Sequence, residues 1–172
     1  AEIIIKNDTP MVSVASTTFV YDKNLAKKDS DHGGLIGLTS GKTTIENVIM
    51  EGTVCSGESG GGFIGYIVNA EANIKNSIMR GKVSAQNNCG GFIGNSGDNT
   101  VFNISNCKNY GSVTGDKYVG GIVGRATGNT VTITNSTNEG KITANNDFIG
   151  GIIGGIEGIN SSKFENCTNS GT

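Results

Sequence analysis

Short apolar segments alternate with glycine-rich turns from Gly33 to the last residue of the chain. The segments are rich in β-branched side chains and alternate apolar with polar positions, as in the run from Thr130 to Thr134. A period of two predicts half-buried strands, and no stretch shows the 3.6-residue period of a helix. The pattern therefore predicts an all-β protein.

Two blocks of sequence recur five times along the chain. The first is a Gly-Gly-apolar-apolar-Gly block whose copies are spaced by 28, 29, 30 and 30 residues, and they begin at Gly33, Gly61, Gly90, Gly120 and Gly150. The second is an apolar residue two positions before an Asn, with a Gly five positions after that Asn. Self-similarity at a period of 20 to 50 residues is typical of stacked units that bury their apolar sides against their neighbours.

The length of the repeat distinguishes a parallel β-helix from a β-propeller. A unit of about 30 residues holds two or three strands with turns, which is one coil of a parallel β-helix, whereas a propeller blade needs about 40 to 45 residues. We therefore predict a right-handed parallel β-helix (β-solenoid) of about five coils of 28–31 residues. The coils are expected at 33–60, 61–89, 90–119, 120–149 and, incomplete, 150–172, after an N-terminal cap or irregular first coil at 1–32.

Equivalent residues of successive coils should stack into ladders about 4.8 Å apart. Three apolar ladders are predicted inside: Ile45, Ile74, Ile104, Ile133 and Phe164; Val54, Val83, Val113 and Ile142; and Ile36, Ile64, Ile93, Val123 and Ile153. Asparagine tolerates turn geometry and its amide can bond between coils, so the recurring Asn predicts a structural ladder at a corner. This ladder is Asn47, Asn76, Asn106, Asn135 and Asn166.

One apolar row has two interpretations. Neighbouring side chains of a strand point to opposite faces, so if the second apolar residue of the glycine block points inward, the first points outward. Such an outward stripe would mark a contact surface for assembly. A bend at the glycines that turns both residues inward is the alternative. The possible assembly stripe is Leu35, Phe63, Phe92, Ile122 and Ile152.

Composition narrows the function classes. With 13 Lys plus Arg against 15 Asp plus Glu and no block of like charges, no nucleic-acid partner is predicted. No stretch approaches the roughly 20 apolar residues of a membrane span, so no membrane insertion by this segment is expected. The 28 glycines lack the Gly-X-Y period of collagen. The four cysteines are too few for a disulfide scaffold and lack metal-ligand spacing.

The residues that could carry chemistry form no convincing constellation. The segment from Gly37 to Thr43 looks like a phosphate-binding loop, but it is one residue short and no helix pattern follows. His32 is the single histidine, and the acidic residues are scattered with no recurring pair. We therefore predict no catalytic residue, no metal ligand and no cofactor.

The blocks resemble the GLUG-motif repeats, whose Gly-Leu-aliphatic-Gly core stands here as Gly34 to Gly37; the other four copies carry Phe or Ile in place of Leu. The family's Asn-(Ser/Cys) step and Gly-x-Val segment are matched by Asn76-Ser77 and by Gly81 to Val83. The resemblance runs from Gly33 to Thr172. It implies a piece of a large extracellular or surface protein, such as an adhesin or an IgA-cleaving metallopeptidase, and supplies no catalytic residues.

We accordingly expect a non-catalytic extracellular structural module: a stalk, a spacer or a subunit of a surface or filamentous assembly. Its partners would be further copies or the rest of a larger surface protein. The alternative is an adhesin module that binds a host protein or a glycan. The stretch from Asn166 to Thr172 stops in mid-repeat without a polar cap, so we also expect that the natural protein continues or that something docks there.

Overall fold

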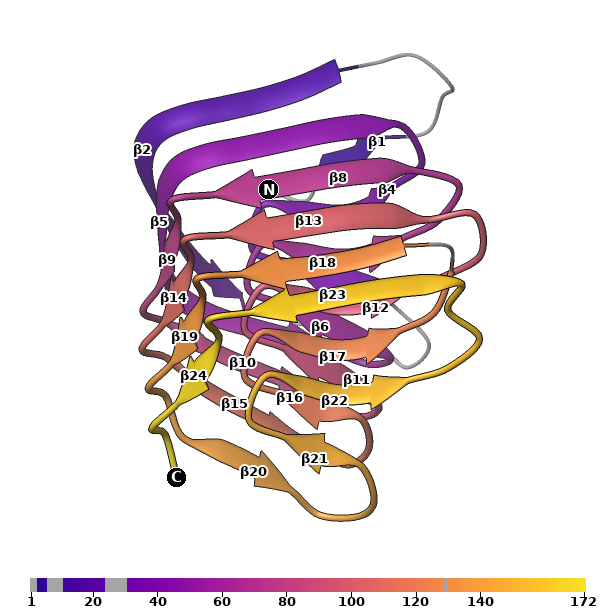
Figure 1. The fold of residues 1–172 in the computed structure, drawn as a ribbon. Helices are drawn as coiled ribbons and strands as arrows, with labels where there is room; N and C mark the ends of the chain where they lie inside the picture. The colour runs from indigo at the N-terminus through magenta and orange to yellow at the C-terminus, as the bar shows by residue number, and fades with distance from the viewer. Residues whose placement is uncertain (1–2, 6–10, 24–30, 129) are drawn as a thin grey trace.

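The computed structural model describes residues 3–5, 11–23, 31–128 and 130–172. These residues contain strands and no helix, and they form a parallel β-solenoid of about five turns (Figure 1). Equivalent strands of successive coils lie side by side and pair in parallel. The predicted fold class is confirmed, while its right-handed winding stays a prediction.

Two of the three sheets contain one strand from each coil. Sheet A consists of β1 (Ile3–Ile5), β4 (Ile36–Thr39), β7 (Ile64–Ile67), β12 (Ile93–Ser96), β17 (Val123–Ala126) and β22 (Ile153–Ile156). Sheet C consists of β3 (Asp31–Gly33), β6 (Ser59–Gly61), β11 (Asn88–Gly90), β16 (Val119–Gly120) and β21 (Ile149–Gly150).

Sheet B is larger and is folded at a corner. Its first row is β2 (Met11–Lys23), β5 (Lys42–Ser56), β8 (Glu71–Lys75), β13 (Val101–Ser105), β18 (Thr130–Thr134) and β23 (Ser161–Glu165). Its corner row is β9 (Ile78–Met79), β14 (Lys108–Asn109), β19 (Thr137–Asn138) and β24 (Thr168–Asn169). Its last row is β10 (Lys82–Ala85), β15 (Ser112–Gly115) and β20 (Ile142–Ala144). Strand β5 is long enough to pair with β8, β9 and β10 in turn.

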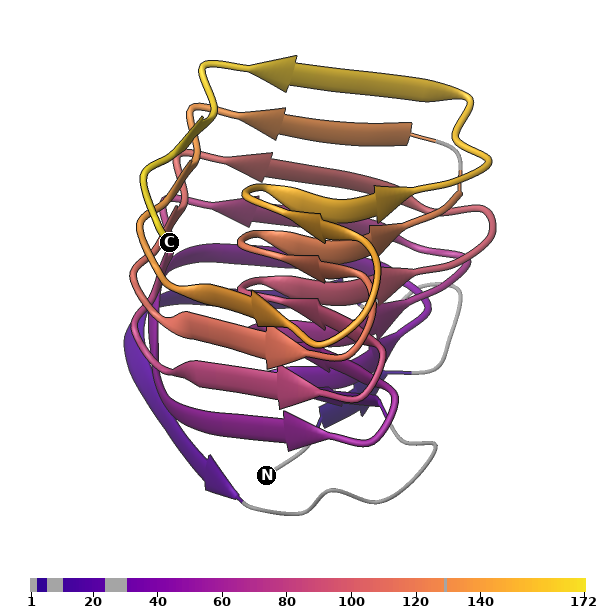
Figure 2. The ribbon, with the colours of Figure 1, turned by 90° about the horizontal axis from the view of Figure 1, so that it is seen from below.

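Seen from below, the layers follow one another as the last row of sheet B, sheet C, sheet A and the first row of sheet B (Figure 2). The apolar core fills the inside, and the predicted inward row Ile45, Ile74, Ile104 and Ile133 is fully buried. Phe164, its last member, is 42% exposed because its coil has a neighbour on one side only. The alternation of apolar and polar residues therefore correctly predicted which face of the first row of sheet B points inward.

Of the two interpretations of the row Leu35, Phe63, Phe92, Ile122 and Ile152, the structure agrees with the bend that turns both residues inward and excludes the outward stripe. The first four side chains are buried, and Ile152, in the last coil, is half-buried and packs against the same core. The physical reason is that each residue sits in a bend between a strand of sheet C and one of sheet A, so the rule of alternation within one strand does not apply. The rings of Phe63 and Phe92 stack inside with centroids 4.7 Å apart. This row belongs to the core and offers no assembly surface.

The glycine block lets sheets C and A pack backbone against backbone. A Cβ added at Gly94 would lie 2.7 Å from the carbonyl oxygen of Gly65 and 2.8 Å from the backbone of Gly60. A Cβ on Gly61 would overlap the carbonyl of Ile64 across the bend. Real Cβ atoms do not approach this closely, so these positions require glycine. The recurring glycines are thus explained by close approach of the backbone.

Parts of the predicted cap at 1–32 lie outside the described residues, namely 1–2, 6–10 and 24–30. Of the rest, β1 pairs with β4 and β2 pairs with β5, both in parallel. Strand β3, at the end of this segment, pairs with β6 in the same way. The division of the chain at residue 32 and the boundaries of the coils stay predictions.

Candidate functional site

The corner asparagines Asn47, Asn76, Asn106, Asn135 and Asn166 all have a left-handed backbone, with φ between 49° and 57°. Their side chains are exposed. The amide of Asn106 donates to Asn76 Oδ1 at 3.3 Å, and that of Asn166 donates to Asn135 Oδ1 at 3.1 Å. Asparagine favours this backbone geometry because its short polar side chain bonds locally. The row therefore has a structural explanation and needs no ligand.

A second asparagine ladder lies in the corner row of sheet B, and the sequence reasoning missed it. It consists of Asn109, Asn138 and Asn169. Asn109 donates to Asn138 Oδ1 at 2.8 Å, and Asn138 donates to Asn169 Oδ1 at 2.7 Å. The signal was a recurring Asn-x-Gly step, but the first two coils carry Met50 and Met79 at this position. Asn109 and Asn138 are fully buried, so this ladder belongs to the scaffold as well.

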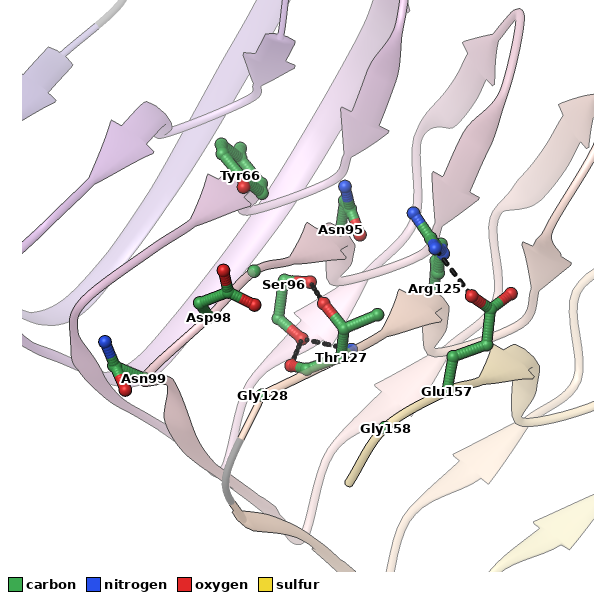
Figure 3. Close-up of a pocket in the computed structure, with 11 residues that line it drawn as sticks. Tyr66, Asn95, Ser96, Asp98, Asn99, Arg125, Thr127, Gly128, Glu157 and Gly158 are labelled. Carbon is green, nitrogen blue, oxygen red and sulfur yellow. Dashed lines mark hydrogen bonds and ion pairs between the residues drawn. The ribbon is translucent and has the colours of Figure 1, made fainter. Parts of the chain in front are cut away.

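A groove of about 720 Å³ opens beside sheet A (Figure 3). Tyr66, Asn95 and Arg125 line it, and they occupy paired register positions on β7, β12 and β17. Two residues earlier on the same strands, the side chains are apolar and point into the core. Ser96, the last residue of β12, also lines the groove. The turns after β12, β17 and β22 supply the other lining residues, which are Gly97, Asp98, Asn99, Thr127, Gly128, Glu157 and Gly158.

Arg125 is fixed in place by a cluster at one end of the groove. Its Nη2 lies 2.6 Å from Glu157 Oε2, and the Tyr118 hydroxyl donates to Glu157 Oε1 at 2.7 Å. The guanidinium carbon lies 5.1 Å from the centroid of the Tyr118 ring, a cation–π distance. Gly155 takes the register position beside Arg125, and a Cβ there would lie 2.5 Å from Tyr118 Cδ1. The missing side chain at Gly155 thus admits the ring that holds the guanidinium.

The protonation states of the groove follow from these contacts. Hydrogen bonds from Arg125 and Tyr118 lower the pKa of Glu157, so this carboxylate is charged at neutral pH. The bond to Glu157 raises the pKa of the Tyr118 hydroxyl. Burial raises the pKa of Tyr66, and the charges of Asp31 and Asp98 add to the effect. Both hydroxyls therefore remain protonated and can donate.

Two polar atoms of residues that line the groove are buried and unsatisfied. Asn95 Oδ1 and Arg125 Nε have no hydrogen-bond partner within the part of the chain that the structure describes. They are one acceptor and one donor on register-paired residues. The adjacent wall is different, since Ser96 Oγ donates to the Thr127 carbonyl at 2.7 Å and accepts from the Thr127 N–H at 3.0 Å. Buried polar atoms are nearly always paired, so these two atoms are exceptions within the described part of the chain.

The other candidate groups do not form a reactive site. Burial raises the thiol pKa of Cys89 and of Cys107 to about 12, which leaves both protonated. The backbone N–H of His32 donates to Ser56 Oγ at 3.2 Å within the buried part of β3. Among residues 31–128 and 130–172, no three or more His, Cys, Asp or Glu side chains come together as a metal site. The described residues also contain no helix able to cross a membrane.

Comparison with known proteins agrees with the fold and with the motif. The family model of the GLUG motif matches residues 115–143, a stretch about as long as one coil that runs from the end of β15 into β20. The chain is thus a β-solenoid, and the GLUG motif that the resemblance implied is matched over this one coil length. No curated protein matches the chain.

A solved structure with a similar fold is that of a Bacteroides ovatus protein provisionally named an immunoglobulin A1 protease. The TM-score is 0.59 and the sequences are 21% identical. The match covers 89% of this chain and 57% of that protein, so the chain spans little more than half of its length. At this identity, the likeness shows the fold alone.

Proposed function

We propose that this chain is a non-catalytic structural repeat module, a stalk or spacer in an extracellular or cell-surface protein. The observation that carries the proposal is the uninterrupted register of the coils. Ile45 pairs with Ile74, Ile74 with Ile104, and Ile104 with Ile133, without a break. In such an array each coil contacts its neighbours, and the length grows by about 4.8 Å for each coil. That is the physical property a spacer requires.

The surface location is supported by the GLUG motif and by the similar fold of a longer protein. The provisional protease name belongs to that protein, and what this chain shares with it is the solenoid fold. We therefore assign to this chain the scaffold role. Its partners in this role are the rest of a larger surface protein or further copies of the chain.

The location is tested with antibodies raised against the purified 172-residue chain. On cells that naturally produce the protein, we expect labelling without permeabilisation and loss of the epitope after treatment with external protease. Labelling that appears only in permeabilised cells would overturn the surface location.

Light scattering during size-exclusion chromatography separates the stalk from the assembly subunit. A mass of 17.7 kDa at every concentration supports the stalk and defeats self-assembly by this segment. Growth of the mass with concentration supports the subunit of a filament instead.

A second candidate function is an adhesin module that binds a host protein or a glycan. The observation that favours it is the row of side chains beside the groove, which changes in every coil while the inward rows stay apolar. Its members are Leu38, Tyr66, Asn95, Arg125 and Gly155. A scaffold alone requires no such variation.

A further inference from the structure

We infer that the C-terminal end of the solenoid binds one β-solenoid coil of a second polypeptide, and that this coil carries the pattern Asn-x-x-Asn-x-Gly at its corner. The inference rests on the scaffold role proposed above and names a partner for it. The binding surface, the terminal face, consists of the edge strands β20 to β24 (Figure 1). Each of them pairs with a strand of the preceding coil, and no described strand lies beyond it.

Exposed apolar side chains gather at the terminal face. In the preceding coil, Val123 and Ile133 are fully buried because the last coil covers them. In the last coil, a hollow of about 220 Å³ is lined by Ile152, Ile153, Ile156, Phe164 and Cys167. Of the five large hydrophobic residues that are exposed in the described part of the chain, four lie in this last turn, namely Phe148, Ile149, Ile156 and Phe164. Such a gathering of apolar side chains marks an interaction surface.

The backbone of the terminal face favours a strand as the binding partner. In the interior, each coil donates N–H groups to carbonyl groups of the coil that follows, as Phe92 donates to Ile122 and Ile122 to Ile152. The N–H of Ile152 takes the next place in this row. A strand added in parallel supplies the carbonyl group, whereas a helix uses its carbonyl groups within its own hydrogen bonds. The partner is therefore expected to add strands in the register of the existing coils.

The buried asparagine ladder specifies an acceptor on the partner. Asn138 donates its amide hydrogens to the Gly140 carbonyl at 3.0 Å and to Asn169 Oδ1 of the next coil at 2.7 Å. Asn169 makes the first of these two bonds, to the Gly171 carbonyl at 3.5 Å. No described coil lies beyond Asn169 to accept the second bond. An amide oxygen of the partner in this row would accept it.

The corner ladder specifies a donor, because its bonds run in the opposite direction. Asn166 donates to Asn135 Oδ1 of the preceding coil at 3.1 Å, so Asn166 Oδ1 is the acceptor for a coil that follows. An asparagine of the partner would donate to Asn166, and a second asparagine three residues later would accept from Asn169. The same spacing occurs in the three coils that form both ladders, at 106–109, 135–138 and 166–169.

The glycine of the pattern follows from the close approach of successive coils. A Cβ on Gly140 would overlap the Gly111 carbonyl, and a Cβ on Gly171 would overlap the Gly140 carbonyl. The partner residue that stacks on Gly171 meets the same restriction. A glycine two positions after the second asparagine therefore completes the pattern.

The N-terminal edge of a second copy does not carry this pattern. Strand β2 forms that edge in sheet B. Its register with β5 places Phe19 in the row of Asn169 and Tyr21 in the row of Gly171. A copy stacked head to tail would thus present phenylalanine and tyrosine where the terminal face requires asparagine and glycine. A different polypeptide with the full pattern is the better match.

The test titrates the full 172-residue chain with a synthetic peptide of one coil. The peptide has the sequence of residues 112–141, in which Asn135, Asn138 and Gly140 supply the pattern. Calorimetry measures the affinity and the stoichiometry, and hydrogen exchange locates the binding. We expect one peptide for each chain and slower exchange of the Ile152 N–H. Exchange in β2, at the opposite end of the solenoid, should be unchanged.

Three peptide variants test the pattern. Asn138→Met removes the acceptor for Asn169, and methionine fits this row, as the buried Met79 shows. Because the Asn169 amide would then be buried without its acceptor, binding should weaken by about tenfold. Gly140→Val would place a side chain against the carbonyl of the stacked glycine and should abolish binding. The control Thr132→Ala changes an outward position of β18 and should leave the affinity unchanged.

Two variants of the chain test the surface. Phe164→Asp places a charge on the terminal face, and Tyr110→Asp is the matched control away from it, since both natural side chains are 42% exposed. Both variants should fold with similar melting temperatures. Phe164→Asp should weaken peptide binding by at least about tenfold, because the complex would bury an unpaired charge, and Tyr110→Asp should not.

Each alternative outcome has a distinct meaning. Absence of saturable binding would overturn the inference, and so would equal affinities of the natural and the Asn138→Met peptides. Equal affinities of the Phe164→Asp and Tyr110→Asp chains, or slower exchange in β2 instead of at Ile152, would also overturn it. Growth of the mass of the chain alone with concentration, if Phe164→Asp abolishes it, would assign the terminal face to a second copy instead.

The surface-labelling test of the scaffold role is independent of these results. Labelling that appears only in permeabilised cells would remove the surface location and leave the peptide binding in place. A failure of peptide binding would leave the surface location in place.

Discussion

Two rows of side chains run along the same strands of sheet A and behave in opposite ways. The inner row, Ile36, Ile64, Ile93, Val123 and Ile153, is apolar in every coil. The outer row, two residues further on, is Leu38, Tyr66, Asn95, Arg125 and Gly155, and it changes character from coil to coil. The inner row must fill the same space against the same neighbours in each coil, whereas the outer row meets solvent and turns.

The contrast teaches where to look for function in a solenoid. Repetition indicates what each coil needs in order to stack, because identical environments select similar residues. A position that keeps its register but carries a different type of side chain in each coil is not constrained by the stacking of the coils. In this chain those positions gather Tyr66, Asn95 and Arg125 at one groove.

The substitution Phe92→Ala should cause the largest loss of stability among the single substitutions considered. Phe92 is fully buried and stacks on Phe63, so truncation should lower the free energy of unfolding by about 3 to 5 kcal/mol, the usual cost for a buried aromatic residue. Denaturant titration measures the loss. The control is Phe164→Ala, where the side chain is 42% exposed and the loss should be less than half as large. Similar losses at both positions would contradict the inward placement of the Phe92 row.

Gly94→Ala tests the backbone packing of sheets C and A. The new Cβ would meet the backbone on both sides, at 2.7 Å and 2.8 Å, and neither side can move without shifting a strand. We expect a loss of about 3 kcal/mol or more, the upper end of overpacking costs. At Gly158 nothing lies within 4 Å and φ is +62°, so the matching substitution costs only the backbone strain of about 1 kcal/mol. Equal melting temperatures of the two variants would be incompatible with this packing.

The two asparagine ladders provide the next comparison. Asn138→Ala removes a buried amide that donates to the Gly140 carbonyl and to Asn169 Oδ1, and should cost about 2 kcal/mol. Asn135→Gly removes an exposed member of the corner ladder, and glycine accepts its φ of 49° without strain, so it should cost a few tenths of a kcal/mol. Equilibrium unfolding measures both free-energy losses. A larger loss for Asn135→Gly than for Asn138→Ala would contradict the conclusion that the buried ladder contributes more to stability.

The two buried thiols should have the smallest effect on the free energy of unfolding, and this effect depends on pH. Burial raises the thiol pKa of Cys89 and of Cys107 to about 12, above the value of about 8.5 for an unfolded chain. From about pH 9 upward the unfolded chain loses thiol protons that the folded chain keeps, so the thiol contribution to stability falls as the pH rises towards 12. By pH 10 the fall should reach about 1 to 2 kcal/mol for each thiol.

The measurement compares unfolding at pH 7 and pH 10 for the natural chain and for Cys89→Ala. The variant should lose less stability between the two pH values than the natural chain does. In the folded protein, a thiol reagent should label the half-buried Cys55 and Cys167 before Cys89 and Cys107. An identical pH dependence of both chains would show that Cys89 is not buried as described.

Much of the fold could be predicted because the same pattern of glycine, apolar and asparagine positions recurs five times in the sequence. The glycine spacing and the Ile45 row predicted the coils and the inward face of sheet B. The direction of the Phe63 row could not be derived in the same way. Alternation applies within one strand, and the bend at Gly62 and Phe63 depends on sheets C and A packing backbone to backbone, which is a tertiary effect.

The groove was harder to predict than the fold. Tyr66, Asn95 and Arg125 share a register position but no chemistry, so a comparison that looks for similarity between coils passes over them. Tyr118 and Glu157 join the site from turns of other coils, and no spacing rule connects them to Arg125. The signal that could have found the row is its variation at a fixed distance from an invariant apolar position.

The inner row of sheet A folds the solenoid, and the outer row is not required for folding. The most direct measurement is the unfolding of one variant that carries Tyr66→Ser, Asn95→Ser and Arg125→Ser together, beside a second variant that carries Ile64→Ser, Ile93→Ser and Val123→Ser. We predict that the first variant forms a parallel β-solenoid whose unfolding free energy is within about 2 kcal/mol of the natural chain, because these side chains lie outside the core, and that the second fails to fold. Failure of the first variant to fold, or equal stabilities of the two variants, would contradict this division of the two rows.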